Sequence, residues 1–183
     1  MNDIATQPPP IPRTARRAAY ILSKPDWLVV SWVLALKVIF FVFGAQSYKI
    51  LQNQRQPGFH GWLELWNRWD SLHYQKLAQF GYSATDTLKV WFYPLFPWCI
   101  RAFAYLTGDY LISAFIVSGL AGLIAAILLR RLVELDYHTR TSLSAVWFFL
   151  IFPTAYFLHV GYTESLFLAL SIGSIFAART SRW

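Results

Sequence analysis

The chain has 183 residues, of which 56% are hydrophobic, 19% are aromatic and only 14% are charged. A soluble domain carries about 25% charged and 45–50% apolar residues, so this composition indicates an integral membrane protein. The net charge of +7 does not indicate a nucleic-acid partner, because the basic residues stand at the ends of apolar runs and not in a patch interleaved with polar sequence.

Residues 1–24 are basic and proline-rich, and we predict that they form a disordered cytoplasmic tail. We predict that the rest of the chain, residues 25–183, forms one transmembrane domain with an all-α fold. About 20 apolar residues span a bilayer as a helix. Four apolar runs are candidate spans, the last of them short, at residues 27–45, 110–129, 142–160 and 165–178.

The stretch 91–106, WFYPLFPWCIRAFAYL, decides the topology. If it crosses the membrane there are five spans, and the basic residues near the two ends of the chain fall on opposite sides. If it lies in the interface there are four spans, and nine arginines and lysines share one side, as the positive-inside bias favours. Pro94, Pro97 and Arg101 also disfavour a lipid-facing span. We therefore predict four spans, with the loop 46–90 on the non-cytoplasmic face.

Within the loop 46–90, bulky residues recur at helical spacing over residues 62–80. This pattern predicts at least one amphipathic helix that lies along the membrane surface, with its tryptophans at the level of the lipid headgroups. On such a helix Asp70, His73 and Tyr74 share a face, because they are three and four residues apart.

Spacing alone leaves two interpretations of Asp70. It can cap the helix by accepting a hydrogen bond from a backbone N–H of the next turn. It can instead act as a general base towards a sugar hydroxyl, with Arg68 or His73 facing a phosphate. Glu164, in the motif GYTES, is either an acid in the first turn of a helix capped by Thr163 or a carboxylate facing a polar cavity. The four-span topology brings Asp70 and Glu164 to one face.

Three motifs occur in order along the chain: RWDSLHYQKLAQFGY, FYPLFP and FPTAYFLHVGYTESLFLAL. Together they resemble the PIG-V-like mannosyltransferases, which belong to the GT-C class of membrane glycosyltransferases and take sugar from a polyprenyl-phosphate carrier. The resemblance covers about residues 25–180. It implies a base aspartate in the first extracytoplasmic loop, which is Asp70 here. The motifs that it assigns to substrate binding match at Trp69, His73, Tyr74, Pro94, Tyr162 and Glu164.

The resemblance thus implies a mannosyltransferase that moves a sugar from polyprenyl phosphate to an acceptor hydroxyl, with inversion, on the non-cytoplasmic face. Asp70 is the expected catalytic base, and Arg68, His73 or Arg101 are expected to bind the phosphate and stabilise its charge. The histidines are scattered without a metal-ligand spacing, so we expect no metal and no other cofactor. The lipid-phosphate sugar is a substrate.

Enzymes of this class have more spans than these four, so the resemblance also implies a missing C-terminal half or a partner subunit. The other expected partners are membrane lipid and the polyprenyl-phosphate sugar donor. A bacterial cell membrane is favoured over an endoplasmic reticulum membrane. The alternative function is a non-catalytic, truncated membrane subunit that packs on or regulates a partner, since the small residues of SGLAGLIAA suit close helix contact. A transporter is disfavoured because the chain has no internal repeat.

Overall fold

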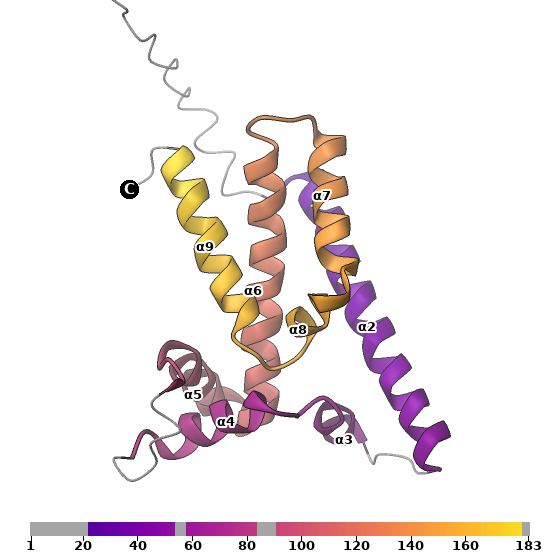
Figure 1. The fold of residues 1–183 in the computed structure, drawn as a ribbon, viewed down its shortest axis with the longest axis vertical. Helices are drawn as coiled ribbons and strands as arrows, with labels where there is room; N and C mark the ends of the chain where they lie inside the picture. The colour runs from indigo at the N-terminus through magenta and orange to yellow at the C-terminus, as the bar shows by residue number, and fades with distance from the viewer. Residues whose placement is uncertain (1–21, 54–57, 84–90, 181–183) are drawn as a thin grey trace, which may run out of the picture.

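The computed structural model describes residues 22–53, 58–83 and 91–180. Within these ranges all regular structure is helical and no strand occurs, which confirms the predicted all-α fold (Figure 1). Most of the predicted N-terminal tail lies outside the described residues. The elements are α2 (Lys24–Gln52), α3 (Gly58–Glu64), α4 (Asp70–Phe80), α5 (Leu95–Thr107), α6 (Tyr110–Val133), α7 (Thr139–Ile151), the short 3-10 helix η2 (Pro153–Ala155), α8 (Tyr156–His159) and α9 (Glu164–Arg179).

Helix α6 stands at the centre of the bundle and packs against α2, α5, α7 and α9 (Figure 1). Its buried face consists largely of small residues, which let neighbouring backbones approach closely. The contact with α9 shows this: Ser118 donates a hydrogen bond to Ser165 across 3.3 Å. A Cβ on Gly122 would lie 3.3 Å from the carbonyl oxygen of Leu158, so a larger side chain there would push α8 away.

By length and composition, α2 and α6 are long enough to cross a membrane. The third predicted span is broken: α7 and the η2–α8 segment pass the test only together, and they are bent by 71°. Pro153 explains the break, because it has no N–H for the helix ladder and its ring clashes with the preceding turn. The fourth, α9, has 16 residues. The described residues therefore hold two candidate spans, or three if the bent pair counts as one, and the predicted number of four stays a prediction.

Helices α3, α4 and α5 all lie at the end of the bundle where α6 begins, with α4 and α5 packed together and α3 apart from them (Figure 1). The 13 residues of α5 extend about 20 Å, less than the hydrocarbon thickness of about 30 Å, which agrees with the prediction that residues 91–106 do not span. The helical spacing over residues 62–80 predicted at least one helix in this stretch, and α4 confirms it. The chain leaves the helix between Glu64 and Asp70, where Trp69 has a φ of +46°.

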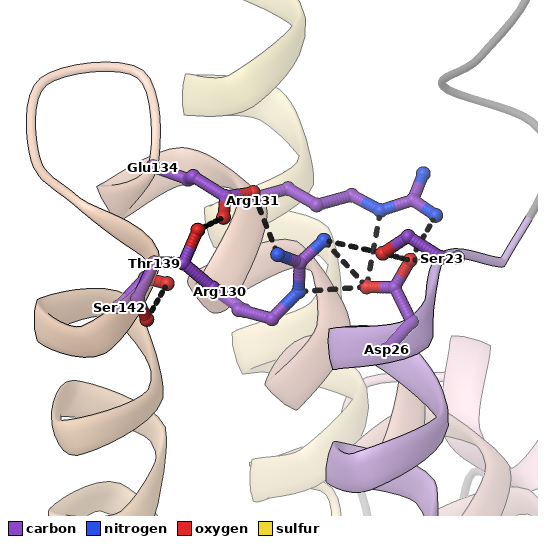
Figure 2. Close-up of polar contacts among 7 residues, drawn as sticks. All are labelled: Ser23, Asp26, Arg130, Arg131, Glu134, Thr139 and Ser142. Atoms are coloured by element: carbon purple, nitrogen blue, oxygen red, sulfur yellow. Dashed lines mark hydrogen bonds and ion pairs between the residues drawn. The ribbon is translucent and has the colours of Figure 1, made fainter.

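At the opposite end of the bundle α2 and α7 begin and α6 and α9 end (Figure 1). We call it the basic end, because it carries Lys24, Arg130, Arg131, Arg140 and Arg179. A buried ion network joins three helices there (Figure 2). Arg130 and Arg131 each donate to the fully buried carboxylate of Asp26, both at 2.7 Å. Arg130 also pairs with Glu134 at 2.6 Å, and Glu134 accepts a hydrogen bond from the Thr139 hydroxyl at 2.6 Å. The network ties the start of α2 to the end of α6 and the start of α7.

Candidate active site

Asp70 is the first residue of α4, and its exposed carboxylate makes no hydrogen bond or ion pair with any described residue. The N-cap position belongs to Trp69, whose positive φ turns the chain into the helix, and no side chain caps this end. The interpretation of Asp70 as a helix cap is therefore wrong. Its carboxylate is left free to accept a proton or a hydrogen bond from a ligand.

Helix α4 presents two faces with different environments. Tyr74 is buried and packs edge-on against Phe92 and Phe96, with ring centroids 5.0 and 5.1 Å away. His73 is exposed, and its ring lies 5.2 Å from that of Phe92. Asp70 and His73 thus remain open to a ligand, while Tyr74 anchors the helix on the FYPLFP segment.

The junction between α8 and α9 packs directly on the start of α4. The Tyr162 hydroxyl donates to the backbone carbonyl of Arg68 at 2.7 Å. The hydroxyl oxygens of Tyr74 and Thr163 lie 3.4 Å apart. A Cβ on Gly161 would lie 3.3 Å from the Ser71 hydroxyl. These contacts join segments about 90 residues apart and hold the turn before Asp70 beside the start of α9.

Glu164 lies just ahead of the apolar run of α9 and interacts electrostatically with Asp70. Burial raises the pKa of the Glu164 carboxyl, and the nearby negative charge of Asp70 raises it further. Burial, together with the charges of Tyr156, Asp70 and Glu164, raises the pKa of the Tyr162 phenol to about 12. The structure therefore brings Asp70, Tyr162 and Glu164 into one cluster, as the predicted topology requires.

An open cavity of about 330 Å³ lies between α9 and the packed pair α4–α5. Tyr74, Thr163 and Glu164 give it a polar side. The rest of its lining is apolar or aromatic: Tyr93, Leu95, Phe96, Leu166, Phe167 and Leu170. One carboxylate oxygen of Glu164 is buried without a hydrogen-bond partner among the described residues. Such a cavity suits a ligand with an apolar chain and a polar head.

Arg101 does not join this cluster. Its guanidinium donates to the backbone carbonyls of Leu77 at 3.3 Å and Ala78 at 2.5 Å. These carbonyls belong to the last turns of α4, about 12 Å along the axis from Asp70. The Leu77 carbonyl also accepts a hydrogen bond from the backbone N–H of Gly81. Arg101 therefore adds hydrogen bonds at the C-terminal end of α4 and ties α4 to α5.

The remaining predicted residues lie around the cluster. Pro94 occupies the N-cap position of α5, and its carbonyl accepts a hydrogen bond from the backbone of Trp98 at 2.9 Å. Trp69 is 69% exposed beside Asp70. The Arg68 side chain is exposed, and its charge acts on Tyr156 of α8.

Two further residues contribute to this arrangement. Thr163 does hold the N-cap position of α9, as predicted, but its side chain makes no cap bond and faces Tyr74 instead. Lys37, in the middle of α2, donates to the carbonyl of His159 at 3.1 Å, where α8 ends. In the sequence, a lysine inside an apolar run indicates such a contact, because a cation at this depth needs a polar partner.

Comparison with known proteins gave two matches. A family model described as Mannosyltransferase (PIG-V) matches residues 57–183. A protein named GPI mannosyltransferase 2, from Yarrowia lipolytica (strain CLIB 122 / E 150), is 35% identical over 72 residues. That match covers 39% of this chain but only 20% of the relative's length. No solved structure matches the chain.

Proposed function

The chain belongs to the mannosyltransferase (PIG-V) family, and on that premise we propose that it transfers a mannosyl unit from a polyprenyl-phosphate donor to an acceptor hydroxyl on the non-cytoplasmic face of its membrane. The observation that carries the proposal is the free Asp70 carboxylate, which lies in one cluster with Tyr162 and Glu164. The predicted host, a bacterial cell membrane rather than an endoplasmic reticulum membrane, stays a prediction.

In the proposed reaction Asp70 acts as the general base. The acceptor oxygen forms a bond to the anomeric carbon while the bond between that carbon and the donor phosphate oxygen breaks. The acceptor proton goes to Asp70, and the electron pair of the broken bond leaves with the lipid phosphate. A single displacement of this kind inverts the configuration at the anomeric carbon. The phosphate is already an anion and needs no acid catalyst, so one base suffices.

The apolar isoprene chain and the charged phosphate of the donor need different surroundings. We propose that the first isoprene units lie in the cavity beside α9, whose lining is mostly apolar. The phosphate would then sit near Arg68 and His73, which flank Asp70 and are both exposed. Charge-assisted hydrogen bonds from these two side chains would stabilise the charge that the phosphate gains. Arg101, predicted to share this role, has its guanidinium bound to α4 carbonyls.

The test is sugar transfer by membranes that contain the full chain, with labelled mannosyl polyprenyl phosphate as donor. Asp70→Asn should keep its abundance in the membrane, because Asp70 makes no cap bond, and should lose transfer by about 10²–10⁴-fold. Asp136→Asn, at the basic end, is the matched control and should transfer normally. Near-normal transfer by Asp70→Asn would end the assignment of the base. No transfer by the wild-type chain would favour the alternative, a non-catalytic membrane subunit.

A further inference from the structure

A second cavity, of about 340 Å³, opens between α2 and α7, away from the proposed transfer site. It is lined by Trp32, Arg140, Leu143, Ser144, Trp147 and Phe148. The Ser144 hydroxyl is already used, because it donates to the carbonyl of Arg140 at 3.1 Å. Among these lining residues Arg140 alone is charged, and the others apart from Ser144 are apolar or aromatic.

The depth of this cavity follows from the helix registers. Both α2 and α7 begin at the basic end, and Trp32 and Trp147 each stand eight residues after the first residue of their helix. At the rise of an α-helix, both indoles lie about 12 Å from the basic end, and their ring centroids are 5.3 Å apart. Arg140 is in the first turn of α7. In the predicted topology, in which α2 and the α7 segment cross the membrane, the cavity would run from the membrane surface into the hydrocarbon layer, with the cation at its mouth.

Arg140 differs from the other described arginines of this end. Arg130 and Arg131 pair with Asp26, and Arg179 pairs with Asp136 at 2.6 Å. Arg140 is exposed and has no carboxylate partner in the part of the chain that the structure describes. One uncompensated positive charge thus stands at the mouth of an apolar cavity at the level where lipid phosphates lie.

We propose that this cavity binds one anionic phospholipid from the leaflet at the basic end. An acyl chain lies beside Trp32 and Trp147, and the headgroup phosphate accepts hydrogen bonds from the Arg140 guanidinium, whose fork of donors matches phosphate oxygens. A headgroup with net negative charge is preferred over a zwitterionic one, because an ammonium group would place a second positive charge near Arg140. The site is independent of the proposed transfer reaction.

Native mass spectrometry of the full chain, released from detergent with dioleoyl phosphatidylglycerol or dioleoyl phosphatidylcholine, tests the site. The wild type should retain phosphatidylglycerol with about fivefold preference, the factor expected for one basic residue at an anionic membrane surface. Arg140→Gln should lose that preference. Arg179→Gln is the matched control: it removes an arginine from the same end, but one that is already paired, and should keep the preference.

A second variant tests the cavity without changing the charge. Ser144 is exposed and lines the cavity, so Ser144→Trp should fill it and remove binding of both lipids while leaving the fold intact. The proposal is overturned if Arg140→Gln keeps the wild-type preference, or if Ser144→Trp binds phosphatidylglycerol as the wild type does. Equal losses in Arg140→Gln and Arg179→Gln would also overturn it, because they would indicate an effect of total charge only.

Discussion

The buried ion network at the basic end makes a quantitative prediction about stability. The Asp26 carboxylate is fully buried and accepts hydrogen bonds from the Ser23 backbone N–H and hydroxyl, both at 2.9 Å, and from Arg130 and Arg131. Asp26→Asn keeps the size of the side chain but removes its charge, and its amide group would face two guanidinium groups. Removing one partner of a buried ion pair costs about 3–5 kcal/mol, because the other charge stays buried without compensation. Arg130, 3% exposed, would keep only one of its two carboxylate partners, the partly exposed Glu134.

We therefore expect Asp26→Asn to lower the free energy of unfolding of the full chain by about 3 kcal/mol, the lower end of this range, because Arg130 keeps its pair with Glu134. The measurement is a denaturant titration in detergent micelles, followed by circular dichroism. Arg130→Met should also destabilise the chain, and the double variant should lose less than the sum of the two, since both changes remove the same ion pair. Asp136→Asn is the control: its carboxylate lies just as close to Arg179, at 2.6 Å, but in solvent, and its loss should change little. A loss below about 1 kcal/mol for Asp26→Asn would refute this reasoning.

Two further predictions concern the junction before α9. Burial raises the pKa of Glu164 above its usual 4.5, so the stability of the wild type should fall as the pH rises through the shifted pKa. Glu164→Gln should therefore melt at a higher temperature than the wild type at about pH 7.5. At about pH 3.5, where both side chains are neutral, the two proteins should melt at the same temperature. A difference that does not change with pH would contradict this cause. Lys37→Met should release the His159 carbonyl and expose the junction. The probe is a cysteine at the buried position Val160, in a chain whose native cysteine is replaced. In Lys37→Met this cysteine should react with maleimide at least about tenfold faster than with Lys37 present, the factor for one charge-assisted hydrogen bond. Lys37→Arg should keep the cysteine protected, and equal protection in both variants would contradict the role of Lys37.

Several local features around the candidate site were predicted from short motifs. The run around Asp70 predicted a helix outside the membrane spans, and α4 occupies residues 70–80. Pro94, Pro97 and Arg101 indicated that the segment containing them does not span, and α5 is too short to do so. The three ordered motifs indicated the family, and the family match confirms that resemblance. These features depend on residues close together in the sequence, which is why a pattern can identify them.

The points at which the helices around the site begin and end could not be predicted from spacing, because they depend on the local backbone. The spacing of Trp62, Trp66 and Trp69 fits one helical face, but the chain leaves the helix between α3 and α4. Trp66 instead packs on α2 so closely that a Cβ on Gly44 would lie 2.2 Å from its ring. Tertiary packing of a large aromatic side chain thus outweighed the local tendency to continue the helix. The same break put Trp69, and not Asp70, at the N-cap position.

The sequence by itself determined that this is an all-α membrane protein of the PIG-V family, since composition, apolar runs and ordered motifs are properties of the chain and not of its packing. Only the tertiary structure decided which polar groups meet. Arg130 reaches Asp26 across 104 residues, Lys37 reaches His159 across 122, and Tyr162 reaches Arg68 across 94. In an apolar bundle a buried polar group is stable only with a partner, and helix packing determines which groups come within reach. The same packing left the Asp70 carboxylate without a partner among the described residues, one helical turn before Tyr74, which lines the cavity proposed for the donor.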